Sequence, residues 1–574
     1  MKHVALLVLT WIFLGTINLS AQVDYVYPQN ESFTYEQAIS AFDYLVKEYP
    51  EVEMVEYGKT DVGRPLHLAI FNANQEFDPQ QIDRKEQSVI LINNAIHPGE
   101  SCGVDATVRL FEYLATHRKL FPNVVVIAIP VYNVGGMLNR SPYNRSGQPG
   151  PTECGFRGNY QNLDLNRDFV KCDSRNAREF SRIYHDWNPD LFFDTHTTNG
   201  SDHQYTLTLI LSQKEKMNPV LAEYVYGKME PLIYRKMEEK GYEVVPYVYG
   251  RGKTPEEGIM DFMETPRYSS GYVNLFNTIG IITEAHKYKT FTQRVEHTYQ
   301  FLKFMTEYAS RNHTELSRVR ELANEYSVGQ QIYDLNWELD TNQWDSLPFK
   351  GYGHEQAVSA VTGQAKLAYQ RDEPKTFNIP YFRTYKATDS VSLPDYYILP
   401  QCYEDVVDRL QLNRVEMQAL TEDTLIPGEV YYIEKVKSLN HAYENHFAHT
   451  DLKIRRDTQR VQFYSGDWII PTQQKNVRYL VEVLEPRGAD SFFRWNFFDN
   501  ILMQKEWFSA FAFDDVAQEL LDTDPDLKRE FDAKRNSDAE FAGNHRAQLA
   551  WIFYQSPYYE KTHKRYPVLR VYNR

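Results

Sequence analysis

Between residues 33 and 310, short runs of apolar residues alternate with longer segments in which apolar residues recur at helical spacing. The apolar runs that have the length of a buried strand are 88–94, 123–133, 190–195 and 280–285. The segments with helical spacing are 101–119, 173–187 and 297–311. Strands that alternate with helices predict an α/β fold, with a mixed, largely parallel sheet flanked by helices.

The pattern changes in the second half of the chain. Residues 332–353 are irregular, whereas 429–438 and 460–471 alternate between apolar and polar residues, which favours strands. Helical spacing returns at 500–551. We therefore predict a C-terminal domain that is β-rich or α+β. The predicted parts of the chain are a signal peptide (1–21), an α/β domain (22–315), a linker (316–350) and a C-terminal domain of unknown role (351–574).

The first residues predict export. Lys2 and His3 precede an apolar stretch at 4–17, and small residues follow near Ala21, as in a secretory signal peptide. An uncleaved membrane anchor is the alternative, but the stretch is shorter than the ~20 residues that usually span a bilayer. No later segment reaches that length without charges. We expect an exported protein, periplasmic or secreted, whose mature chain begins near Gln22 and has no stable membrane span.

Composition narrows the classes of partner. A length of 574 residues suggests two or three domains, and 42% hydrophobic with 14% aromatic residues indicates a folded protein. The net charge of -16 argues against nucleic acid or an anionic membrane surface as the main partner. Four cysteines are too few for a disulfide scaffold. Cys154 and Cys172 bracket a loop-rich stretch, and they either form a disulfide or remain free thiols.

Polar residues that suit a metal site follow three of the predicted strands. His97 follows the first strand, His196 follows the third, Glu284 lies near the end of the fourth, and Glu100 lies three residues after His97. Because ligands bind outside the carboxyl ends of strands in open α/β sheets, we expect these side chains at one edge. Two imidazoles and a carboxylate are ligands of catalytic zinc, and Glu284 would then be the general base. The alternatives are an ordinary polar turn, and a Glu284 that pairs with a cation such as Lys287.

The loop "GFRGNYQNLDLNRDF" (155–169) carries two arginines, Arg157 and Arg167. Guanidinium groups bind carboxylates through two parallel hydrogen bonds, so this loop is expected to clamp a carboxylate of the substrate. Structural salt bridges are the alternative for both side chains.

At this point a resemblance becomes specific. The motifs "HPGE", "DLNRDF", "DTHTTNG" and "ITEAH" occur in the order seen in the zinc carboxypeptidases, the carboxypeptidase A-like metallopeptidases. The resemblance covers roughly residues 33–310. It implies that His97, Glu100 and His196 are the ligands of one zinc ion, and that Glu284 is the catalytic glutamate.

The resemblance also assigns residues that bind the substrate. Asn166 and Arg167 match the Asn-Arg pair that holds the terminal carboxylate, and Asp164 resembles the aspartate that orients a ligand histidine. A ligating imidazole usually donates its other N–H to such a carboxylate. Residues 267–283, a segment that contributes to specificity in this family, contain no Asp or Glu. This favours substrates with a neutral or apolar terminal residue.

Two roles of the family have more than one candidate in this chain. For the arginine that stabilises the oxyanion, the spacing favours Arg157, with Arg145 and Arg140 as alternatives. For the tyrosine that covers the bound substrate, Tyr268 and Tyr272 are candidates, although neither has the spacing seen in carboxypeptidase A. Either tyrosine could instead be an ordinary packed aromatic residue.

A second cluster of histidines lies in the C-terminal half. His441, His446 and His449 are close enough in sequence to share a metal, but no predicted buried strand or converging carboxylate accompanies them. We interpret them as a solvated surface cluster.

The expected function is therefore that of an exported zinc metallocarboxypeptidase, which acts on peptides or other carboxylate-terminated amides. One alternative is a zinc amidase or deacylase that acts on cell-wall peptides or N-acyl amino acids. Another is an inactive peptide-binding protein on the same fold, but the intact set of ligands, base and clamp argues against it.

Overall fold

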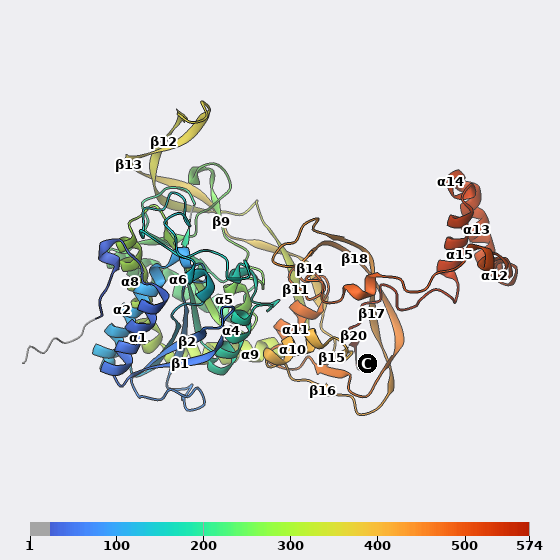
Figure 1. Cartoon of the computed structure of the whole chain (residues 1–574), viewed down its shortest axis with the longest axis horizontal. Coiled ribbons are helices and arrows are strands. Elements are labelled where there is room, and N and C mark those ends of the chain that lie inside the picture. Colours follow the sequence, from blue (N-terminus) through green and yellow to red (C-terminus); the bar gives the residue numbers. More distant parts are fainter. Residues whose placement is uncertain (1–22, 199, 573–574) are drawn as a thin grey trace, which may run out of the picture.

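The computed structural model describes residues 23–198 and 200–572, so the predicted signal peptide lies outside the described residues. The α/β part is built on an eight-stranded sheet with the order β1-β2-β4-β3-β5-β10-β6-β7 (Figure 1). Its strands are β1 (Val52–Lys59), β2 (Pro65–Asn72), β3 (Ser88–Asn93), β4 (Val124–Ile129), β5 (Leu191–Thr198), β6 (Leu207–Leu211), β7 (Val244–Pro246) and β10 (Ile279–His286).

The centre of this sheet is parallel. Strands β4, β3, β5 and β10 run in one direction, while β1, β2 and β6 pair antiparallel with their neighbours on the inner side. All four predicted strands are present, and the predicted mixed, largely parallel sheet is confirmed. The carboxyl ends of β3, β5 and β10 therefore lie side by side, as the argument for a shared site requires.

Helices cover both faces of the sheet, because successive side chains of a strand point to opposite faces. Ile90 and Ile92 of β3 pack in the core that contains α1, α2 and α8, whereas Val89 and Leu91 pack in the core that contains α4 and α7. The helices of this part are α1 (Tyr35–Glu48), α2 (Cys102–Thr116), α3 (Val134–Leu138), α4 (Arg175–Trp187), α5 (Pro219–Tyr224), α6 (Glu230–Glu239), α7 (Ser269–Asn274), α8 (Phe291–Arg311) and α9 (His313–Gly329).

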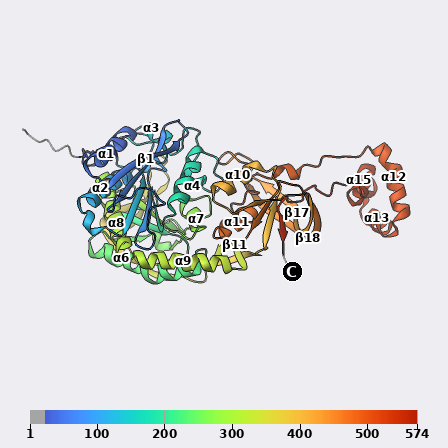
Figure 2. The same ribbon diagram turned by 90° about the horizontal axis from the view of Figure 1, so that it is seen from below.

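The C-terminal half is β-rich, as predicted, and α9 runs towards it (Figure 2). A six-stranded sheet has the order β16-β19-β15-β20-β17-β18, and two smaller sheets pair β11 with β14 and join the β12–β13 hairpin to β9 and β8. Two of these strands, β8 (Tyr249–Gly250) and β9 (Ile259–Met260), come from the first half of the chain. The others are β11 (Ile332–Leu339), β12 (Asp345–Val358), β13 (Ala365–Phe382), β14 (Tyr385–Ser392), β15 (Tyr396–Leu399), β16 (Gln418–Ala419), β17 (Thr424–Ser438), β18 (His449–Phe463), β19 (Trp468–Pro471) and β20 (Leu569–Val571).

Residues 332–353 and 500–551 test two predictions for this half of the chain. The expectation of irregular structure at 332–353 is wrong, because these residues form β11 and the first part of β12. The helical spacing at 500–551 is confirmed by α12 (Ala510–Thr523), α13 (Pro525–Ser537), α14 (Ala539–Ala542) and α15 (His545–Gln555). These helices pack around a small core of their own and stand apart from the rest of the described chain (Figure 1, Figure 2).

The β-rich part is joined to the α/β part by a shared hydrophobic core. One cluster of buried residues contains Phe180 and Tyr272 of the α/β part together with Tyr479 and Trp495 of the β-rich part. Helices α10 (Glu404–Leu412) and α11 (Val477–Leu484) lie at this junction, where Phe276 stacks on Tyr479 with ring centroids 5.4 Å apart. The two parts therefore bury apolar surface against each other, and their boundary is a packed interface.

Two further expectations concern the chemistry of the chain. Cys154 and Cys172 are buried free thiols, so the structure has no disulfide between them. None of the helices in residues 23–198 and 200–572 is long and apolar enough to cross a membrane.

Candidate active site

Three potential metal ligands meet at the carboxyl end of the sheet. His97 follows β3, Glu100 ends the short turn Pro98–Glu100, and His196 lies in β5. One ligand atom from each residue lies within 4.8 Å of the other two, and all three side chains are buried. Glu100 Oε2 is 3.5 Å from His97 Nδ1 and 3.2 Å from His196 Nδ1.

The local sequence explains how the turn and β5 approach so closely. Gly103, in the first turn of α2, has no room for a side chain, because a Cβ there would lie 1.9 Å from Thr195 Oγ1. The start of α2 therefore rests directly against β5, which brings the residues of the turn to His196.

This group of atoms fits a zinc ion. His97 Nδ1 is buried and has no hydrogen-bond partner in the described residues, although a buried polar atom normally has one. A metal would satisfy that atom, and two imidazoles with one carboxylate are the donor set of a catalytic zinc site. Among the described residues, this is the one group of at least three such side chains with suitable spacing.

Carboxylates orient both imidazoles. His97 Nε2 lies 2.8 Å from Asp164 Oδ1, and His196 Nε2 lies 3.0 Å from Asp194 Oδ2. Asp164 can accept the Nε2 proton of His97, and the ion pair with Asp194 holds the Nε2 side of the His196 ring. The Nδ1 atoms of both rings therefore face Glu100. Burial alone would lower the pKa of His196, but the Asp194 carboxylate raises this pKa well above its usual value.

Asp194 was not predicted from the sequence. It precedes His196 by two residues in the same strand, and residues at that spacing lie on the same face of a sheet. Asn93 and Ser269 donate hydrogen bonds to its two oxygens, at 3.1 and 2.6 Å, and these bonds hold the carboxylate in place. The spacing within "DTHTT" was the signal that could have identified it.

We expect Asp164→Asn to weaken zinc binding by about ten- to a hundredfold, the usual cost of changing a group that orients a ligand. An asparagine has the same shape, but its neutral oxygen is a weaker acceptor for the His97 N–H. The measurement is the zinc dissociation constant, by competition with a chelator. Asp43→Asn, on the exposed surface of α1, is the control. Equal zinc affinity in the two variants would contradict the role of Asp164.

Arg145 is bound to Glu100, one of the three potential metal ligands. Its Nη1 donates to Glu100 Oε1 at 2.8 Å, its Nη2 donates to the Thr197 carbonyl at 2.9 Å, and its Nε donates to Gln148 at 3.2 Å. Burial alone would raise the pKa of Glu100, but Arg145 and His97 hold this pKa well below its usual range. Glu100 is therefore ionised, as a metal ligand must be.

Glu284 lies on β10 directly beside His196 of β5. Both line a cavity of about 220 Å³ that also includes His97 and Glu100. Burial raises the pKa of Glu284 to about 7, with the positive charge of His196 acting in the opposite direction. A carboxylate with a pKa near neutrality can both accept and release a proton, as general acid–base catalysis requires. Lys287, the alternative partner, instead donates to the Ser146 carbonyl.

The predicted clamp lines the same cavity. Asn166 and Arg167 lie in the short turn Leu165–Arg167, and both contribute to the cavity wall. Asn166 Oδ1 accepts the Ser269 N–H at 3.1 Å, so its amide nitrogen remains the available donor. The guanidinium of Arg167 stacks over the Tyr268 ring, 4.4 Å from the centroid. Its ion pair with Asp164 is long, at 3.9 Å, which leaves charge for a substrate carboxylate.

The three candidate arginines occupy different positions. Arg157 lines the cavity, binds Asp164 at 2.8 Å through Nη2, and places Nη1 3.6 Å from Glu100, beyond hydrogen-bond distance. Arg145 lines the cavity with its donors in use, as described above. Arg140 is absent from the cavity wall and donates to the carbonyls of Phe33 and Glu153.

The two candidate tyrosines lie in different places. Tyr268 lines the cavity, whereas Tyr272 is fully buried in the core and donates to Asn413 at 2.6 Å. The structure therefore places Tyr272 away from the site, because its ring packs against Phe169 and Phe180 in the core. Sequence reasoning missed three aromatic residues of the cavity wall, Tyr247, Tyr249 and Phe262. Burial and the nearby charge of Glu284 raise the pKa of Tyr247, so its hydroxyl stays protonated.

The three histidines between residues 441 and 449 each contact a different residue. His446 contacts Asp173 at 2.7 Å, and His449 contacts Asp499 at 2.8 Å. His441 is exposed and contacts its neighbour Asn440.

Known proteins resemble this chain in sequence and fold. The model of the family described as zinc carboxypeptidase matches residues 38–354, more than half of the chain. Carboxypeptidase 2 of Trichophyton tonsurans is 19% identical over 452 residues, covering 76% of this chain and 78% of that protein. Carboxypeptidase 2 of Trichophyton rubrum is 20% identical over 454 residues, with the same coverage. A metallo-carboxypeptidase from Burkholderia cenocepacia, 16% identical, covers 49% of this chain and 70% of its own with a TM-score of 0.37. The chain thus belongs to the zinc carboxypeptidase family and is a metallocarboxypeptidase.

Proposed function

We propose that this enzyme releases C-terminal residues from peptides, with His97, Glu100 and His196 as zinc ligands and Glu284 as general base. The observation that carries the proposal is the convergence of ligands, base and clamp on one cavity of about 220 Å³. A binding protein would need the clamp, but it would not need a half-buried carboxylate, Glu284, in the same cavity as the candidate metal ligands.

The zinc ion would polarise the scissile carbonyl and make water a stronger acid. Glu284 is placed to take a proton from that water on its carboxylate and to return it to the leaving amine. Arg157 is the better candidate to stabilise the oxyanion, since it lines the cavity and its Nη1 is outside hydrogen-bond distance of Glu100. Arg145 would instead hold Glu100 in position.

The cavity wall supports a preference for neutral or apolar terminal residues. Besides the catalytic groups, it contains Ile210, Ile282, Phe262 and Tyr249, and the carboxylates that line it are Glu100 and Glu284. Both acids already have roles, so neither is available to pair with a terminal Lys or Arg. Tyr268, which faces the same cavity, would cover the bound substrate.

The experiment compares peptides with a free C-terminal carboxylate, the same peptides with a C-terminal amide, N-acyl amino acids and cell-wall peptides. We expect cleavage of the free-carboxylate peptides and little of the amides. Faster cleavage of acyl amino acids or cell-wall peptides would identify an amidase or deacylase instead.

We expect Arg167→Gln to raise KM for free-carboxylate peptides by about a hundredfold, because a substrate carboxylate would lose its charged partner inside the cavity. The same change should alter the slow cleavage of amidated peptides by less than about threefold, since an amide has no charge to pair. KM for both peptide series is the measurement. Arg235→Gln, on the exposed face of α6, is the control. An equal effect on acids and amides would contradict the clamp.

Export remains part of the proposal. The charged start, the apolar stretch at 4–17 and the small residues near Ala21 support cleavage before Gln22. N-terminal sequencing of the protein from the culture medium or periplasm would test it. We also keep the division at 22–315, 316–350 and 351–574 as a proposal, with most of α9 and all of β11 inside the linker segment.

A further inference from the structure

A tight turn of the β-rich part lies against the clamp loop of the α/β part. This turn, residues 443–446, lies between β17 and β18, and Tyr443 and His446 close it with two backbone hydrogen bonds of 2.8 and 3.0 Å. The two residues at its tip, Glu444 and Asn445, have φ angles of 48° and 71°. Asparagine tolerates this left-handed conformation, whereas glutamate is disfavoured there. A side chain kept at a strained position suggests a function.

Glu444 binds the backbone of the clamp loop. Its Oε2 accepts the Asp164 N–H at 2.9 Å. Asp164 is the residue from which the turn carrying Asn166 and Arg167 begins, and its own Oδ1 accepts the Asn166 N–H at 2.9 Å and contacts His97 at 2.8 Å. One hydrogen bond from the β-rich part therefore holds the residue that connects the clamp to the metal site.

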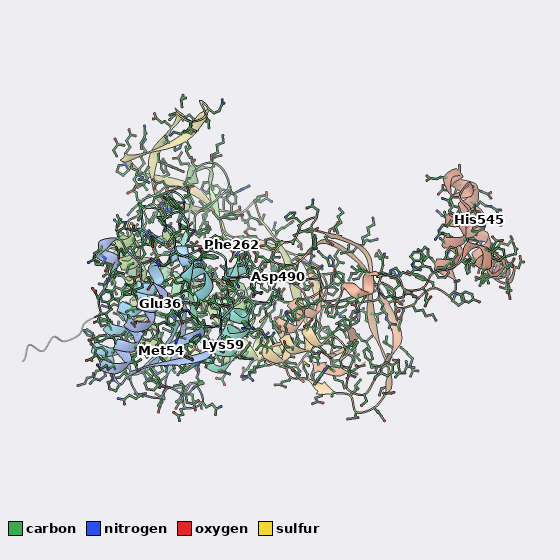
Figure 3. All side chains as sticks on the ribbon, viewed as in Figure 1. Glu36, Met54, Lys59, Phe262, Asp490 and His545 are labelled. Carbon is green, nitrogen blue, oxygen red and sulfur yellow. The ribbon has the colours of Figure 1, made fainter. Side chains whose placement is uncertain are left out.

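Two further contacts join the β-rich part to the α/β part near this turn. His446 Nε2 lies 2.7 Å from Asp173 Oδ2, so the turn is attached to the α/β part at both Glu444 and His446. Asp490, a buried residue of the β-rich part, accepts from the backbone and the guanidinium of Arg267 at 2.9 and 2.7 Å. Figure 3 shows Asp490 where the two parts of the chain meet.

The second of these contacts also leads to the clamp. Arg267 immediately precedes Tyr268, on which Arg167 stacks, and Ser269, whose N–H binds Asn166 Oδ1. The Asn166–Arg167 pair thus lies between two segments that the β-rich part binds. Glu444 binds Asp164, and Asp490 binds Arg267.

We propose that Glu444 is a positioning residue for the substrate-carboxylate clamp, so that the β-rich part completes the active site of the α/β part. This proposal rests on the proposed function, because it takes Asn166 and Arg167 to bind the terminal carboxylate. Glu444 is absent from the cavity wall, so it acts through the Asp164 backbone and touches no substrate atom. This positioning role requires a hydrogen-bond acceptor at residue 444 that reaches the Asp164 N–H, and the acceptor need not be charged.

Three substitutions of Glu444 test separately the length of its side chain, its hydrogen-bond acceptor and its charge. Glu444→Ala removes the acceptor, Glu444→Asp keeps the charge but is one methylene too short, and Glu444→Gln keeps an acceptor oxygen at the same length. We expect KM for free-carboxylate peptides to rise about tenfold in the Ala and Asp variants, with kcat within twofold of wild type. We expect Glu444→Gln to restore KM to within about twofold of wild type.

Product binding gives a readout that does not depend on turnover. The dissociation constant of a released amino acid, measured by calorimetry, should rise about tenfold in the Ala and Asp variants, while zinc content stays the same. Glu422→Ala, at an exposed position of the same part, is the control and should match wild type. Thermal unfolding of each variant checks the fold, and if Glu444→Ala unfolds, the Asp and Gln pair alone decides.

The outcomes distinguish this proposal from the proposed function. Wild type that cleaves amidated and free peptides equally would overturn both. Wild type with the expected preference, together with a Glu444→Asp variant of unchanged KM and product affinity, would overturn the positioning role alone. A Glu444→Gln variant as impaired as Glu444→Asp would also overturn it, because the hydrogen-bond acceptor would then be irrelevant.

Discussion

Glu284→Gln should lower kcat for peptide cleavage by about a thousandfold while the protein still binds one zinc ion. Glutamine has the shape of glutamate but cannot take a proton from water near neutral pH, and positioned general bases contribute about 10²–10⁴-fold to a rate. The half-buried position of Glu284 beside His196, and its pKa of about 7, make it the carboxylate of the cavity best suited to this task. KM should change little, because the clamp on loop 155–169 is intact.

The measurement is kcat and KM on a free-carboxylate peptide, with zinc content determined on the same samples. Glu223→Gln, at an exposed position of α5, is the matched control and should retain wild-type rates. If Glu284→Gln and wild type released amino acids at the same rate, Glu284 could not be the base. If the variant lost its zinc as well, the loss of activity would have to be assigned to the metal site instead.

The sheet was predictable because its central strands are buried on both faces. Runs such as 88–94 and 190–195 are almost continuously apolar, which is the pattern of a parallel sheet covered by helices on both sides. Strands β11 and β12 were missed for the opposite reason. They lie on small sheets with exposed faces, so polar residues interrupt their pattern, as the exposed positions along β12 show. Short-range periodicity carries little information where only part of a strand is buried.

Part of the site was predictable because His97 and Glu100 share one turn. His196 and Glu284 lie near the carboxyl ends of two predicted strands, and the rule that ligands bind at that edge of an α/β sheet placed them with the turn. Tyr247 was missed because it lies in an irregular segment after β7, for which the pattern predicts no position. The side-chain direction of Tyr272 was equally inaccessible, since it depends on how α7 packs.

Contacts between the two parts of the chain could not be predicted at all. The hydrogen bond from Asp164 to Glu444 joins residues 280 positions apart. Nothing in a single sequence indicates which turn of one part will pack against which loop of another, because such docking depends on the shape of both folded surfaces. The "HAYENHFAHTD" segment drew attention for its histidines, whereas its contribution to the site region is the glutamate between them.

His196→Ala should abolish peptide cleavage and stoichiometric zinc binding together. His196 comes from β5 in the centre of the sheet, and its removal leaves His97 and Glu100 as the two remaining ligands. A protein site with two ligands does not retain zinc against a chelator, since catalytic sites use three protein ligands. In wild type, removal of the metal by a chelator should likewise abolish activity, and added zinc should restore it.

A thermal measurement tests this assignment without substrate. Zinc at a thousandfold excess over its dissociation constant should stabilise wild type by about 4 kcal/mol, because it binds the folded state and not the unfolded one. The Tm of wild type should therefore rise with zinc and fall with chelator, and the Tm of His196→Ala should respond to neither. His545→Ala, on the surface of α15 and far from the site (Figure 3), should respond as wild type does. A His196→Ala protein that holds one zinc ion with wild-type affinity would refute the ligand assignment, because the buried His97 and Glu100 cannot bind it that tightly alone.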